Sequence, residues 1–124
     1  MDSKSRRLFA GCDNKMMAVV DADTGKVIAT PAIGQGVDAN GFDPQTNYAF
    51  ASCGDGTLTV VHEDSPNKFT VVDNVPTKRS ARTMALDMNT HDIFLSSADL
   101  EPPAPGERRG RIKPSSFAIQ VVGR

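Results

Sequence analysis

The sequence predicts an all-β fold built from repeated antiparallel units, and two observations support this prediction. A nine-residue phrase begins at Met1, returns at Phe42 and returns again at Leu86, so that its copies are 41 and 44 residues apart. A fixed period in this range is typical of a repeat architecture. Between the copies, apolar runs are short and end at turns rich in Asp, Asn and Gly, which is the pattern of β-hairpins. No window has apolar residues at helical intervals, so no helix is expected.

Each copy of the phrase predicts a turn between two strands. All three copies have an apolar residue followed by Asp, then Ser or Thr at the fifth position, and an apolar pair that ends in Phe. The carboxylates of Asp43 and Asp87 stand where such a turn begins. They can accept hydrogen bonds from N–H groups two or three residues later, or from Thr46 and Thr90. We therefore expect these aspartates to stabilise turns and to have no part in catalysis.

The apolar runs give the order of the strands. The first unit is expected to have strands at 8–12, 16–21 and 26–30, and the second at 48–53, 57–62 and 69–75, with a polar connection at 63–68. A further strand rich in small residues is expected before each later copy of the phrase, at 36–43 and 80–87. Residues 98–114 are rich in Pro, Gly and Arg and are expected to form an extended surface loop, after which a last strand follows at 116–122.

Four strands in 41 to 44 residues fit one blade of a β-propeller. Small side chains are expected on the inner strand of each blade, where the blades converge. The expected fold is therefore a partial β-propeller of antiparallel four-stranded blades, a single domain over residues 1–124 that holds about 2.5 to 3 blades. The blade remnants are 1–31, 32–76 and 77–124. Because the first copy of the phrase begins at residue 1, the chain is expected to be a piece of a longer array.

The composition excludes some classes of protein. The formal net charge is −1, whereas a general nucleic-acid binder usually has a strong basic excess. No apolar stretch has the length of a membrane span, and the polar N-terminal segment lacks the apolar run of a secretory signal. The chain as written is therefore expected to be cytoplasmic and to have no membrane partner, and a longer parent is expected to be periplasmic or secreted.

Two cysteines, Cys12 and Cys53, are 41 residues apart and so occupy the same place in successive units. One interpretation is that they form a disulfide or bind a metal together. The other is that they are two small buried residues that were duplicated with the repeat unit. Equivalent positions in neighbouring units usually lie farther apart than the ~4.4–6.8 Å between the Cα atoms of a disulfide. Further Cys and His residues at ligand spacing are missing. We expect no disulfide and no metal site.

Several segments resemble the YVTN-type, or YncE-like, β-propellers of bacteria. Residues 19–27 resemble the strand, D-x-x-T-G-K turn and outer strand of that family, residues 33–39 its blade-start motif, and residues 42–46 its hairpin motif. The end of the chain, 114–124, is similar to the C-terminus of such proteins. The resemblance implies a ring of about seven blades in a full-length member. It also implies a binding or scaffold protein, with no defined chemistry and no cofactor.

Propellers usually bind ligands at one mouth of the central channel, near the start of the inner strands. The candidate ligand-binding residues there are Gln35, Asp38, Asn40, Arg79 and Arg82. Asp38 and Arg82 have near-equivalent places in neighbouring units, so they bind either a ligand or each other, and we favour their pairing. His91 lies in an expected turn and is therefore expected to be solvated, whereas His62 follows an expected strand. Neither has a Ser or Cys nucleophile at motif spacing. No catalytic residue is assigned.

The basic segment at 108–113 is either a solvated surface loop or a segment that binds phosphate groups. Arg108, Arg109, Arg111 and Lys113 can attract phosphate groups. However, Glu101 and Glu107 partly offset their charge, and no aromatic stacking partner is expected nearby. A solvated loop is the favoured interpretation, so a nucleic-acid partner is not expected.

The favoured function is a non-enzymatic binding or scaffold fragment with an unknown small ligand. One alternative is that the chain is part of a propeller enzyme, either a lactonase-like hydrolase or a quinoprotein. Another chain or missing blades would complete the site of this enzyme. Asp38 and Asn40 are then the candidates to bind a metal in the channel. A second alternative is a weak single-stranded nucleic-acid binder that uses Arg82 and the 108–113 segment. The exposed edges expected at 8–10 and 116–122 also predict self-association, as a homodimer or a small ring.

Overall fold

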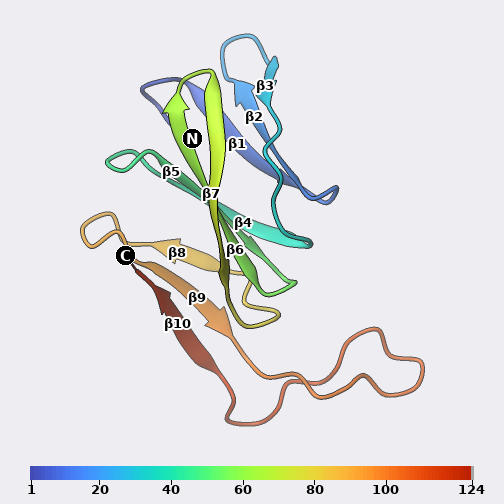
Figure 1. Cartoon of the computed structure of the whole chain (residues 1–124). Helices are drawn as coiled ribbons and strands as arrows, with labels where there is room; N and C mark the ends of the chain where they lie inside the picture. Colours follow the sequence, from blue (N-terminus) through green and yellow to red (C-terminus); the bar gives the residue numbers. More distant parts are fainter. Residues whose placement is uncertain (124) are drawn as a thin grey trace.

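All regular structure in the protein is β-strand, as a computed structural model that describes residues 1–123 shows (Figure 1). The prediction of an all-β fold is confirmed. No helix able to span a membrane occurs in this part of the chain. The ten strands are β1 (Arg7–Cys12), β2 (Met16–Asp21), β3 (Val27–Ala29), β4 (Val37–Asp43), β5 (Tyr48–Cys53), β6 (Thr57–Ser65), β7 (Lys68–Pro76), β8 (Met84–Leu86), β9 (Ile93–Ser97) and β10 (Ala118–Val122).

The strands form three antiparallel sheets whose strand order follows the chain. The first sheet contains β1 to β3, the second β4 to β7 and the third β8 to β10, with three, four and three strands. Strands β1, β5 and β9 begin within the three copies of the phrase, while β4 and β8 end at the start of the second and third copies. Each sheet therefore contains one copy of the sequence period.

Several predicted strand boundaries are wrong, two of them by more than two residues. The polar connection at 63–68 belongs to strands β6 and β7, which continue to a tight hairpin in which Ser65 is opposite Lys68. The strand expected at 80–87 is confined to β8, because Ser80 has a φ of 69° and the N–H of Ala81 donates to the carbonyl of Lys78 in a turn. A positive φ interrupts an extended strand.

The turns predicted by the phrase are confirmed. The Oδ1 atom of Asp43 accepts a hydrogen bond of 2.9 Å from the N–H of Gln45, and that of Asp87 accepts one of 2.8 Å from the N–H of Asn89. Asp2, in the first copy, accepts in the same way from the N–H of Lys4 at 2.9 Å. The sixth residue of each copy has a left-handed backbone, with φ of 58°, 58° and 64° at Arg6, Asn47 and His91.

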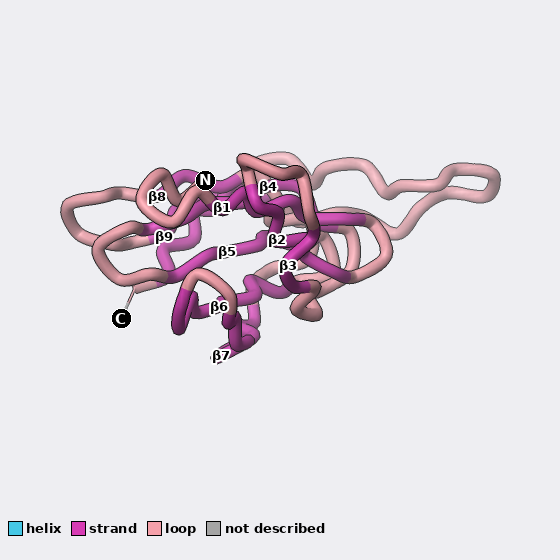
Figure 2. The backbone as a smooth tube through the Cα atoms, turned by 90° about the horizontal axis from the view of Figure 1, so that it is seen from above, coloured by secondary structure: helices cyan, strands magenta, loops and turns pink. Residues whose placement is uncertain are grey.

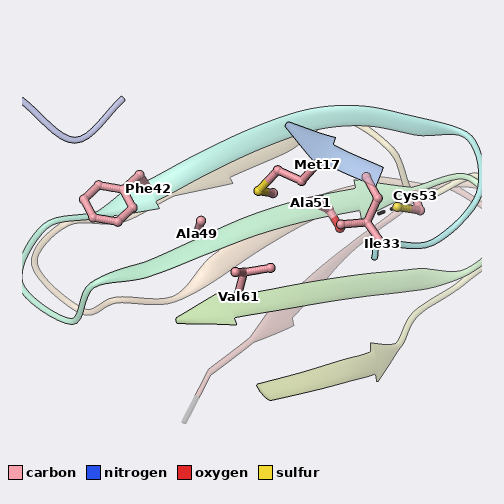
Figure 3. Close-up of a cluster of buried hydrophobic side chains, with 7 residues drawn as sticks. All are labelled: Met17, Ile33, Phe42, Ala49, Ala51, Cys53 and Val61. Carbon is pink, nitrogen blue, oxygen red and sulfur yellow. Dashed lines mark hydrogen bonds between the residues drawn. The ribbon is translucent and has the colours of Figure 1, made fainter. Parts of the chain in front are cut away.

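The three sheets are stacked, with the second sheet in the middle. One hydrophobic core lies between the first and second sheets and is centred on Met17, Phe42, Ala49 and Val61 (Figure 3). A second core lies between the second and third sheets and contains Phe50, Leu58, Ala81, Ile93 and Leu95. Strand β4 contacts both β1 and β8, and these three strands lie along one side of the molecule, with β7 on the opposite side (Figure 2).

A long excursion leaves the third sheet between β9 and β10 (Figures 1 and 2). Its two arms are held together by backbone hydrogen bonds of 2.8 Å, from the N–H of Glu101 to the carbonyl of Arg111 and from the N–H of Lys113 to that of Asp99. Its residues from 99 to 109 are all exposed. The excursion therefore extends from the stacked sheets as an irregular hairpin.

Candidate functional site: a basic cleft

A cleft of about 1240 Å³ lies between the excursion and the loop that connects β7 to β8. Small residues of the β5–β6 turn and of β9 form part of its wall. The lining residues are Gly54, Lys78, Arg79, Ser80, Arg82, Ser96, Ser97, Ala98, Asp99, Leu100, Glu101, Pro102, Pro103, Arg108, Arg109, Gly110, Ile112, Lys113 and Phe117. Two segments that are well separated in the sequence therefore face each other across one hollow.

The cleft has a positive lining. Six basic and two acidic side chains line it. The basic ones are Lys78, Arg79, Arg82, Arg108, Arg109 and Lys113. The two carboxylates are those of Asp99 and Glu101, and the former makes an ion pair of 3.1 Å with Lys78 Nζ. Although Asp38 and Asp55 lie near Arg82 and Arg79, the cations remain in excess, so the electrostatic potential of the cleft favours an anion.

The β5–β6 turn positions the basic loop. Gly54 to Gly56 form this turn, and the carbonyls of Gly54 and Gly56 accept backbone hydrogen bonds from Ser80 at 3.0 Å and Thr77 at 2.8 Å. A Cβ atom at Gly54 would lie 3.2 Å from Cδ of Arg82, so the glycine allows the arginine to pack closely over the turn. The two glycines of the β5–β6 turn thus fix the loop that supplies half of the cations.

Arg82 is held by two contacts. Its Nη2 atom lies 3.2 Å from Oδ1 of Asp38, and its carbonyl accepts a hydrogen bond from the hydroxyl of Ser52. The pairing of Asp38 with Arg82, which the sequence analysis favoured, is therefore present. The Nε atom of Arg82 is buried and has no hydrogen-bond partner among the described residues. This guanidinium therefore has a carboxylate partner, but not all of its donors are used.

The exposed carboxylate of Asp55, in the β5–β6 turn beside the cleft, stays ionised at neutral pH. Burial raises the pKa of Asp55, but hydrogen bonds from the N–H of Gln35 and from Thr57, with the positive charge of Arg79, lower it below its usual value. The bond from Gln35 is 2.8 Å long and ties the segment before β4 to the β5–β6 turn. The negative charge at Asp55 helps to hold Arg79 at the cleft.

The candidate residues named from the sequence fall into two groups. Arg79 and Arg82 line the cleft, and Asp38 adjoins it through its ion pair with Arg82. Gln35 and Asn40 do not line it. Asn40 lies toward β1, since a Cβ atom at Gly11 would be 2.9 Å from its Oδ1 atom.

Phe117 is the site residue that the sequence analysis missed. It lines the cleft with 70% of its surface exposed, so the expectation of no aromatic side chain near the basic segment is wrong. Phe117 was expected inside a strand, whereas β10 begins only at Ala118. Its position four residues after Lys113 was the available signal.

His91 is not a freely solvated side chain, contrary to expectation, and His62 also has a carboxylate partner. The Nδ1 atom of His91 lies 2.6 Å from Oδ2 of the buried Asp43, at a smaller pocket of about 320 Å³ between the second and third sheets. His62 lies within β6, and its Nδ1 atom is 2.7 Å from Oδ1 of Asp64. Both rings are therefore held by neighbouring carboxylates.

The two cysteines are free thiols. Cys53 is fully buried, and burial, with a contribution from the charge of Asp55, raises the pKa of its thiol. Within residues 1–123 there is no group of three or more His, Cys, Asp or Glu side chains arranged to hold a metal ion.

The chain matches no protein-family model, and no curated protein is significantly similar to it. The fold and the site define an all-β protein of three stacked antiparallel sheets with a basic cleft between two loops.

Proposed function

We propose that this chain is a non-enzymatic binding module, a partial β-propeller of the YVTN type, that binds a small ligand with several negative charges in its basic cleft. The observation that carries the proposal is the lining of the cleft by six basic and two acidic side chains. Arginines are suited to such a ligand, because the planar guanidinium donates two parallel hydrogen bonds to a phosphate or carboxylate group.

Three features of the fold support the propeller interpretation. Each sheet contains one copy of the sequence period, and its strand order follows the chain. The sheets pack face to face through hydrophobic cores. The strands β1, β4 and β8 converge along one side, as inner strands do in a radial array.

The chemistry of Arg82 explains how a ligand would be recognised. An oxyanion that drew this side chain away from Asp38 would give its unused Nε donor an acceptor. Hydrogen bonds to charged groups contribute about 1.5 to 3 kcal/mol each. Because Arg108, Arg109 and Lys113 lie on the opposite wall, a ligand with several anionic groups would contact both walls, and one with a single charge would not.

A second candidate ligand is single-stranded nucleic acid. The exposed ring of Phe117 beside the cations favours it, since bases stack on aromatic side chains while basic residues follow the backbone.

Binding titrations would test the proposal. We expect inorganic tripolyphosphate to bind in isothermal titration calorimetry at low salt, with an affinity that falls as salt is added. Replacing Arg82 and Arg108 together with alanine should weaken binding at least tenfold, and Lys26→Ala, an exposed lysine outside the cleft, should leave it unchanged.

The other outcomes are distinct. No binding of tripolyphosphate, or equal binding by the double variant, would contradict an anion site in the cleft. A labelled oligothymidine that binds far more tightly, with a loss of affinity in Phe117→Ala, would favour the nucleic-acid candidate instead. Turnover of lactones or sugar alcohols by the chain would contradict a non-enzymatic function.

A further inference from the structure

The three sheets repeat the same pair of residues at the same place in their register. A phenylalanine that ends the phrase lies opposite a valine of the next strand, and the pairs are Phe9–Val19, Phe50–Val60 and Phe94–Val121. Two residues before each valine, the same strand has another large apolar side chain, which is Met17, Leu58 or Ile119. In a strand such residues point to the same face, so each sheet presents this set on one face.

This face is covered in the first two sheets and open in the third. Met17 and Val19 are fully buried under the second sheet, and Leu58 is fully buried under the third. The corresponding side chains of the third sheet, Ile119 and Val121, are 51% and 57% exposed. The third sheet therefore has an exposed face with the same pattern of side chains as the two faces that are covered.

The opposite faces repeat in the same way. The matching register pairs are Leu8–Val20, Ala49–Val61 and Ile93–Val122. In the second sheet, Ala49 and Val61 are fully buried against the first sheet, and in the third sheet Ile93 is 2% exposed. Leu8, on the first sheet, is 40% exposed. The first sheet thus has an open face of the kind that receives a neighbouring sheet elsewhere in the molecule.

We propose that a second copy of this chain occupies the open face of the third sheet, and that it binds there through the open face of its own first sheet. The contact is head to tail, and it continues the stacking that the chain already shows twice within itself. Such contacts join two different faces. The copies therefore form a closed ring if the rotation between them permits, and an open filament if it does not. Phe94, Ile119 and Val121 do not line the basic cleft, so this contact and the proposed anion site are independent.

The sizes of the side chains favour this partner over a symmetric pair of third sheets. Between the first and second sheets, Met17 packs in one cluster with the small Ala49 and Ala51, while Phe9 stacks on Phe42. The open face of the first sheet also has small residues, since Ala10 lies opposite Ala18. It can therefore receive Ile119 and Val121 from another copy, whereas two third sheets would place large side chains against each other.

Sedimentation of single variants would test the contact. The wild-type chain is expected to sediment as a species of two or more copies at micromolar concentration, rather than as a monomer of 13.2 kDa. Val121→Asp and Leu8→Asp should each raise the dissociation constant at least tenfold. Val72→Asp is the matched control, because Val72 is 50% exposed on β7 and belongs to neither face. Circular dichroism checks that each variant is folded, and Val121→Ser and Leu8→Ser serve where an aspartate disturbs the sheet.

A mixture of the two variants gives the decisive result. Leu8→Asp retains an intact third-sheet face and Val121→Asp retains an intact first-sheet face, so together they should form a dimer that neither forms alone. A monomeric wild type would overturn the proposal. If Leu8→Asp still associated by itself and only Val121→Asp lost association, the contact would be a symmetric pair of third sheets, which would also overturn the proposal. If Val72→Asp lost association, the copies would pair through β7 instead.

Discussion

The Nδ1 atom of His91 lies 2.6 Å from Oδ2 of Asp43, so that the turn of the third unit is bound to the turn of the second. Both residues belong to copies of the same phrase. The carboxylate of Asp43 is 1% exposed and also accepts a hydrogen bond from the N–H of Gln45 at 2.9 Å. One side chain therefore stabilises its own turn and joins two sheets.

Asp43→Asn is expected to destabilise the fold more than Asp87→Asn. The first change weakens a buried interaction with His91, and the loss of a hydrogen bond to a charged group costs about 1 to 3 kcal/mol. Asp87 has the same place in the third unit, but the partners of its carboxylate are the backbone N–H groups of Asn89 and Thr90 in its own turn. Urea denaturation of both variants measures the difference, and equal losses would show that the His91 contact contributes nothing.

Acid should remove part of this stability. Burial raises the pKa of Asp43, but hydrogen bonds from Gln45, Thr46 and His91 lower it below its ordinary value of 3.8. A depressed pKa means that the contribution is fully present above pH 3.8 and is lost as the pH falls through the lower value of the folded state. The free energy of unfolding of the wild type should therefore fall more steeply below pH 3.8 than that of Asp43→Asn, and parallel curves would refute this.

Glu63→Gln is expected to stabilise the protein at neutral pH. Glu63 is 7% exposed, and its Oε2 atom has no hydrogen-bond partner among the described residues. Burial raises its pKa above 4.5, a hydrogen bond from Ser5 opposes this, and the charge of Asp2 raises it further. With a raised pKa, the favourable contribution is complete below pH 4.5 and is lost as the pH rises through the value of the folded state.

A neutral amide in place of this carboxylate would avoid the cost of the buried charge, so we expect Glu63→Gln to gain about 1 kcal/mol at pH 7 and nothing at pH 4. Thermal melting at the two pH values measures the effect, with the exposed Glu101→Gln as a control that should change neither. A loss of stability at pH 7 would show that the charge of Glu63 is needed.

Asp38→Ala should strengthen the binding of a polyanion. Asp38 pairs with Arg82 at the edge of the cleft, and an incoming anion competes with it for the guanidinium. Removing it should increase the affinity for tripolyphosphate by about threefold to tenfold. The stability should barely change, because partly exposed ion pairs contribute about 0 to 1 kcal/mol. Calorimetric titration would compare this variant with Arg82→Ala, which should bind more weakly. Weaker binding by both variants would show that Asp38 supports ligand binding rather than competing with the ligand for Arg82.

The all-β class could be predicted from the sequence, and so could the three phrase turns and the approximate order of the strands. These features are local: the carboxylates of Asp43 and Asp87 bind N–H groups only two or three residues away, and alternating apolar residues act within a single strand. The boundaries at 63–68 and 80–87 were less predictable, because the pairing of β6 with β7 and the turn at Ser80 depend on contacts with other segments.

Tertiary structure alone decided the site. Arg79 and Arg82 were candidates from their place before an inner strand, but only the folded chain brings them opposite Arg108 and Lys113, and it places Phe117 beside them. It also joined His91 to Asp43, although 48 residues separate the two. Periodicity and turn chemistry report interactions between residues close in sequence. The separation of side chains on different sheets depends on how those sheets stack and on the path of the loops between them, which no local pattern specifies.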